Sequence, residues 1–171
     1  MCMRKKKDLR QYEYLAQLNK IQRSYDRLEK CFDEEAQKEV AVISNPEIKD
    51  LCTNLFTEIY HFKDWLKKDA EVPKEVKNLI EQFVGTNEYL SVCGDISNQS
   101  KHKELTSRRS KAKKYENVLM HTKLDLDPLT GFSTSYNATI KVDDNQYNAL
   151  MFAEESVKAW KKFLKKNFLT Y

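Results

Sequence analysis

Hydrophobic residues recur every three or four positions along most of the first hundred residues, a spacing typical of amphipathic helices. The first such stretch runs from Leu9 to about Ala36. A second begins at Asn45, where a capping amide followed by Pro46 and an acidic residue forms a helix-start signal, and it ends near Lys68. These two stretches predict two long helices.

Two shorter helices are expected next along the chain. Pro73 opens a third helix, and Gly85 is expected to stop it. Thr86 or Asn87 then caps a fourth helix, which runs to His102. Each of the four helices has one apolar face, so we expect them to pack together as a bundle.

The period of the hydrophobic pattern changes to two beyond residue 114. Residues from Tyr115 to Leu126 and from Ser133 to Val142 loosely alternate apolar and polar side chains, and the turn-forming segment Asp127–Gly131 separates them. A last amphipathic helix follows Asn145 and carries lysines on its outer face. The predicted fold is therefore mainly α, a bundle of about five helices with a β-hairpin, about 115–142, inserted before the last helix.

Length and composition favour one helical domain over residues 1–171, with no linker inside it. The amino terminus is polar, so we expect no signal peptide, and no apolar run reaches the roughly 18 residues of a membrane span. The four cysteines are widely spaced and form no Cys-x-x-Cys pair, which argues against a zinc site and fits reduced thiols. We expect a cytoplasmic protein without a metal or cofactor.

Three polar residues of the fourth helix form the first candidate site. Asp95, Asn98 and His102 are three and four residues apart, so they lie along one stripe of the helix. In the functional interpretation His102 acts as a general acid or base, and Asp95 or Asn98 positions it. In the structural interpretation Asp95 and Asn98 cap or bridge buried backbone, and His102 is a surface residue.

A second polar pair lies on the second helix, where His61 and Asp64 are three residues apart. If the second and fourth helices pack antiparallel, this pair approaches Asp95 and Asn98. Two histidines with carboxylate partners would suit acid–base cleavage of a phosphodiester. The same groups could instead form a hydrogen-bond network that sets the relative position of the helices. Their spacing matches no known metal-ligand motif.

A basic segment, residues 101–114, directly follows the fourth helix. Seven of its fourteen residues are Lys or Arg. They are Lys101, Lys103, Arg108, Arg109, Lys111, Lys113 and Lys114. Such a run is often only a solvated face, but its position beside His102 suggests a segment that binds phosphates.

At these residues the chain resembles the HEPN superfamily (higher eukaryotes and prokaryotes nucleotide-binding domains). The resemblance covers the helical layout and the segment Asn98-Gln99-Ser100-Lys101-His102. HEPN ribonucleases carry an Arg, four to six further residues and then a His, with a polar residue often following the Arg. Asn98 takes that polar place and His102 the histidine, but Ser97 stands where the Arg would be. The ribonuclease signature is therefore incomplete.

Two strings, His-Phe-Lys-Asp-Trp-Leu at 61–66 and Asp-Ile-Ser-Asn-Gln-Ser-Lys-His at 95–102, are similar to paired marks of a bacterial or phage HEPN-like group. The resemblance implies a homodimer whose motif helices face each other, and a role in toxin–antitoxin, antiphage or RNA-related biology. Three functions remain open. They are an inert module that binds RNA, a nucleotide or a protein, a metal-independent endoribonuclease using His102, and a structural or protein-interaction helical module. The missing Arg favours the binding module over the ribonuclease.

Overall fold

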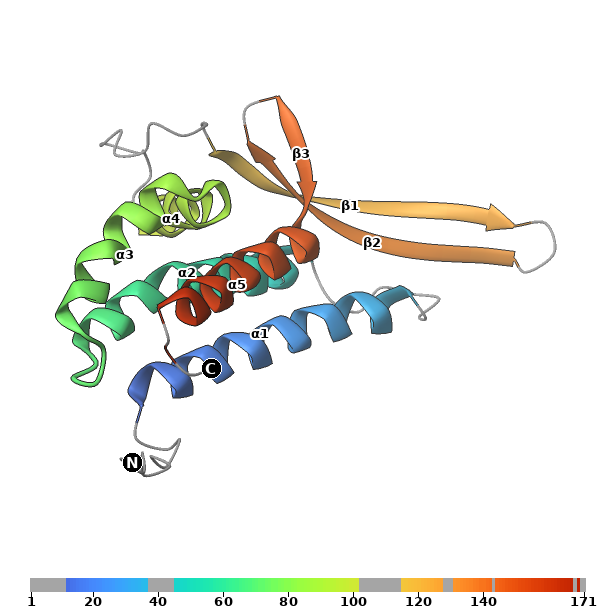
Figure 1. The fold of residues 1–171 in the computed structure, drawn as a ribbon. Helices are drawn as coiled ribbons and strands as arrows, with labels where there is room; N and C mark the ends of the chain where they lie inside the picture. Colours follow the sequence, from blue (N-terminus) through green and yellow to red (C-terminus); the bar gives the residue numbers. More distant parts are fainter. Residues whose placement is uncertain are drawn as a thin grey trace.

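The computed structural model describes residues 12–36, 45–101, 115–127, 131–142, 144–167 and 169, with side chains except at 33–36, 45, 46, 99–101 and 115–137. Its elements, in chain order, are α1 (Glu13–Ala36), α2 (Asn45–Lys68), α3 (Lys74–Thr86), α4 (Glu88–Lys101), β1 (Tyr115–Asp127), β2 (Gly131–Val142), β3 (Asn145–Asn148) and α5 (Ala149–Lys166). The predicted class is confirmed, because a mainly helical structure carries an antiparallel hairpin before its last helix (Figure 1).

The end of α3 differs from expectation, whereas the cap of α4 is one of the two residues expected. Gly85 does not stop α3, which stays helical through Gly85 and ends at Thr86. A glycine ends a helix when it adopts a left-handed conformation, whereas here the following Asn87 turns extended, at φ −87° and ψ 120°. The Asn87 side chain then caps α4, because its Oδ1 accepts a hydrogen bond from the backbone N–H of Leu90 at 3.0 Å.

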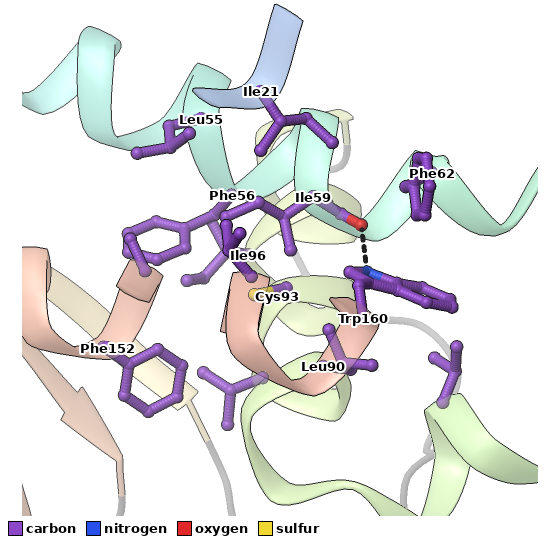
Figure 2. Close-up of a cluster of buried hydrophobic side chains, with 14 of the residues drawn as sticks. Ile21, Leu55, Phe56, Ile59, Phe62, Leu90, Cys93, Ile96, Phe152 and Trp160 are labelled. Carbon is purple, nitrogen blue, oxygen red and sulfur yellow. Dashed lines mark hydrogen bonds between the residues drawn. The ribbon is translucent and has the colours of Figure 1, made fainter. Parts of the chain in front are cut away.

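The helices share one hydrophobic core centred on α2 and α5 (Figure 1). Trp160 of α5 is almost fully buried, and its indole Nε1 donates a hydrogen bond to the backbone oxygen of Ile59 in α2 at 2.9 Å (Figure 2). Phe62 and Phe83 contact its ring edge-on, with centroid distances of 5.1 and 5.6 Å. This cluster joins α2, α3 and α5.

The hairpin packs on the bundle through one end of β2. Ala138, Ile140 and Val142 alternate along β2 and are all buried, whereas the intervening Thr139 and Lys141 are half-exposed. The two long strands run outward from this end (Figure 1). The four-residue β3, which the sequence did not predict, pairs antiparallel with β2 beside the bundle.

A buried carboxylate fixes the start of α1. Asp69, just after α2, is 3% exposed. Its Oδ2 accepts a hydrogen bond from the backbone N–H of Tyr14 at 3.3 Å, and its Oδ1 accepts one from the N–H of Glu71 at 2.9 Å. A carboxylate at a helix amino terminus also meets the positive end of the helix dipole. Asp69 therefore joins the start of α1 to the end of α2.

None of the helices described is both long and apolar enough to cross a membrane.

Replacing this carboxylate should destabilise the protein. We expect Asp69→Ala to lower the free energy of unfolding by about 1–3 kcal/mol, because the buried N–H of Tyr14 and the partly buried N–H of Glu71 lose their acceptor. Urea denaturation followed by circular dichroism would measure the change. Asp26→Ala, on an exposed part of α1, is the matched control and should change stability by less than about 0.5 kcal/mol. Equal effects of the two variants would contradict this role of Asp69.

Candidate functional site

The candidate site lies where α4 packs against α2. Gly94 of α4 faces the Tyr60 ring of α2, and a Cβ atom at Gly94 would lie 2.7 Å from Tyr60 Cε2. Because that distance is well inside van der Waals contact, a side chain at residue 94 would require the Tyr60 ring or the helices to shift. Lys63, which is also on α2, contacts the same ring. Its Nζ lies 2.8 Å from the Tyr60 hydroxyl and 4.1 Å from the ring centroid.

His61 joins the two helices beside this contact. Its Nδ1 lies 2.9 Å from Asp64 Oδ2, and its Nε2 lies 3.3 Å from the hydroxyl oxygen of Ser97 in α4. Ser97 is fully buried, whereas the side chains of His61 and Asp64 are 34% and 42% exposed. The imidazole therefore sits at the surface of the α2–α4 interface, with a hydrogen-bond partner at each ring nitrogen.

The structure brings together only part of the predicted constellation. His61 and Asp64 are in contact, but the α4 residue that reaches His61 is Ser97. On a helix, Asn98 lies about 100° and Asp95 about 160° around the axis from Ser97. Asn98 is accordingly exposed, and Asp95 is partly buried. The sequence predicted that Asp95 and Asn98 approach His61. The structure shows a contact with Ser97 instead, on a neighbouring face of α4.

Ser97 was missed because a single serine has no strong sequence signal. One signal was present, however. Leu90, Gly94 and Ser97 are four and three residues apart, so a large apolar residue and two small residues share one stripe of α4. Small residues on one stripe are suited to close helix packing. The stripe of Asp95 and Asn98 is the more polar one, but the small residues Gly94 and Ser97 are those that contact α2.

The remaining candidates lie at or beyond the end of α4. Lys101 is the last residue of that helix. His102 and the other six cations of the basic segment lie outside the described residues. Since the helix rises about 1.5 Å per residue, the basic segment begins roughly 6 Å along the axis from Ser97.

A surface hollow of about 260 Å³ opens beside His61. It is lined by Glu13, His61, Asp64, Trp65 and Lys68. We refer to it as the Trp65 hollow. Trp65 is 41% exposed, unlike the buried Trp160. The hollow thus offers an aromatic face, two carboxylates and one ammonium group to a ligand.

Lys63 and Lys67 point elsewhere on α2 and are engaged by an acidic partner. Both form ion pairs with Glu81 of α3, that of Lys63 at 3.4 Å. Burial alone would lower the pKa of Lys63, but its hydrogen bond to Tyr60 and the charges of Glu81 and Asp64 raise it overall. These ammonium groups stabilise the α2–α3 pair, so Lys68 is the lysine that lines the hollow.

The geometry limits the chemistry that the described residues can perform. The His61 nitrogens are occupied by Asp64 and Ser97, and the Ser97 hydroxyl is too deeply buried to attack a ligand. Burial raises the pKa of the Cys52 and Cys93 thiols to about 12, so neither forms a thiolate at neutral pH. Among the described residues, no three His, Cys, Asp or Glu side chains are grouped so that they could hold a metal ion.

Comparison with known proteins adds no relative. No protein-family model matches the chain, and neither a curated protein nor a solved structure is significantly similar to it.

The contact between His61 and Ser97 should appear as an energetic coupling. In a double-mutant cycle of His61→Ala and Ser97→Ala, we expect a coupling of about 0.5–1.5 kcal/mol, because each single variant removes the same hydrogen bond. Ser91 supplies the control, since it is buried on α4 and its hydroxyl has no hydrogen-bond partner within the described part of the chain. Ser91→Ala should be additive with His61→Ala in urea denaturation. A cycle with Ser97 that is equally additive would refute the interaction.

Proposed function

We propose that this protein is an HEPN-like module that binds RNA or a nucleotide through the Trp65 hollow and the basic segment, residues 101–114. The observation that carries the proposal is the exposed indole of Trp65 in a hollow whose wall includes the hydrogen-bonded His61. Aromatic faces that bind bases are typical of proteins that recognise single-stranded nucleic acid.

The other groups of the hollow suit the remaining parts of a nucleotide. Asp64 and Glu13 can accept hydrogen bonds from the amino and imino groups of a base, and Lys68 can pair with a phosphate. A volume of about 260 Å³ is slightly below the usual range for a whole small-molecule ligand, so it suits one base with the sugar and phosphate outside.

The basic segment would supply most of the phosphate contacts. It starts one helical turn beyond Ser97, whose hydroxyl contacts His61 at the edge of the Trp65 hollow. A base bound on Trp65 would therefore lie near the end of α4, the helix from which the basic segment continues. This neighbourhood supports RNA over an uncharged ligand, because phosphate contacts dominate the affinity of nucleic-acid binding.

The hydrogen bonds of the His61 imidazole favour binding over catalysis. A general base needs a ring nitrogen that reaches the substrate, and both His61 nitrogens face protein groups instead. The endoribonuclease alternative would therefore depend on His102. Following the family resemblance, we also propose that the protein works as a homodimer in antiphage defence or in a toxin–antitoxin system.

Removal of the indole should weaken RNA binding. We expect Trp65→Ala to lower the affinity for a short single-stranded RNA by about 5- to 150-fold, the effect of losing one stacked base. Fluorescence anisotropy of a labelled RNA would measure it. Leu79→Ala is the matched control, because Leu79 is a similarly exposed hydrophobic residue on α3, and it should leave the affinity unchanged. If the two variants bind RNA equally well, the Trp65 hollow is not the binding site.

The salt dependence tests the basic segment separately. Affinity should fall steeply with salt concentration, and reversing the charges of Arg108 and Arg109 should flatten that slope. An RNA cleavage assay with and without a chelator distinguishes the alternatives. Cleavage that survives the chelator and disappears in His102→Ala would establish the ribonuclease. Binding without cleavage would support the inert module, and no binding even at low salt would leave the structural role.

A further inference from the structure

The outer edge of β1 has no strand paired with it in the described part of the chain. In the described part of the chain the sheet order is β1-β2-β3, so β1 pairs with β2 on one side and lies at the edge of the sheet on the other. It is thirteen residues long. Backbone N–H and C=O groups along the free side of such a strand form a ready template for another strand.

Charged residues alternate along this edge strand. The register pairs His121, Lys123, Asp125 and Asp127 of β1 with Asn137, Ser135, Ser133 and Gly131 of β2 respectively. All four β2 partners in this register are uncharged residues. The same register pairs Met120 with the buried Ala138 and Val118 with the buried Ile140. The charged positions therefore belong to the sheet face opposite the core.

The order of these charges makes the edge complementary to itself. Along β1 it runs His121, Lys123, then Asp125, Asp127, from basic to acidic. We propose that a second copy of this chain pairs with it edge to edge, through β1 strands that run antiparallel about a two-fold axis at Leu124. Lys123 then stands opposite Asp125 of the second copy, and His121 opposite Asp127. The two-fold axis generates each of these pairs twice.

The charges select this register over its neighbours. An axis at Lys123 or at Asp125 would place that residue opposite its own copy, with like charges directly facing. An axis at Leu126 would place Asp125 opposite Asp127, and one at Thr122 would place Lys123 opposite His121. Directly opposed like charges destabilise a strand pair, whereas opposite charges stabilise it. A slip by one residue would bring the core face of one hairpin against the outer face of the other.

This inference goes beyond the proposed function because it names the surface that joins two copies, and it does not depend on RNA binding. Dimerisation is measured without RNA, so its failure is distinguishable from failure of the Trp65 hollow. The resemblance to HEPN proteins implies a different contact, between motif helices, which substitutions on β1 would leave intact.

Charge reversal tests the pairing. In sedimentation velocity over a wide range of concentrations, we expect the unaltered protein to form a dimer. Lys123→Asp and Asp125→Lys should each weaken dimerisation by about tenfold or more, because each turns both central pairs into like charges. Mixing the two variants should restore dimers, since the remaining Asp125 of one then faces the remaining Lys123 of the other. The double variant should again form homodimers by itself.

Two controls keep the result specific. Lys162→Asp, on an exposed part of α5, makes the same charge change elsewhere and should leave the dimer unchanged. The intrachain partners Ser135 and Ser133 are neutral, so neither β1 variant places like charges directly opposite each other across its own hairpin. Recovery of the dimer on mixing also shows that both variants are folded. A monomeric unaltered protein, or a dimer that both single variants leave unweakened, would overturn the proposal.

Discussion

The packing of the Trp160 indole between helices is the interaction on which the rest of this structure depends. It joins α5 to a backbone carbonyl of α2 that is 101 residues earlier in the chain. The ring also fills the space between Phe62 and Phe83, so one side chain holds three helices in place. Burying an aromatic side chain of this size contributes several kcal/mol, and the Nε1 donor is satisfied inside the core. Since α5 follows the hairpin, this contact also determines where the sheet is attached.

The candidate site depends on this packing more than on its own polar groups. His61 lies between Ile59, which accepts the Trp160 hydrogen bond, and Phe62, which contacts the Trp160 ring. Its distance to Ser97 requires the close approach of α4 that Gly94 permits. A wider separation of the helices would break this hydrogen bond, and the loss of a hydrogen bond at a buried group is costly. Core geometry and site geometry are therefore both set by the helices that pack against α2.

The sequence predicted the elements that follow from the period of the hydrophobic pattern. It did not predict features that depend on how one element packs against another. Five helices and the hairpin follow from changes between a period of 3.6 and a period of two, which are properties of each segment alone. Ser97 could not be assigned, because the face of α4 that meets α2 is decided by the packing of Gly94 against Tyr60. The strand β3 has only four residues, too few for an alternating pattern, and forms because β2 offers it an edge. Gly85 stays helical because the chain turns at Asn87 instead.

Binding and catalysis would rest on different elements of this protein. An imidazole with a partner at each nitrogen fixes the relative position of two helices, and a ligand beside it meets the ring rather than a free lone pair. The indole of Trp65, by contrast, is partly exposed to solvent, so its ring can stack on a base. Any acid–base step would therefore fall to His102, which follows α4 next to the cations that would hold the phosphates. Rigid helices would then position the base, while the segment after α4 would supply charge and any reactive group.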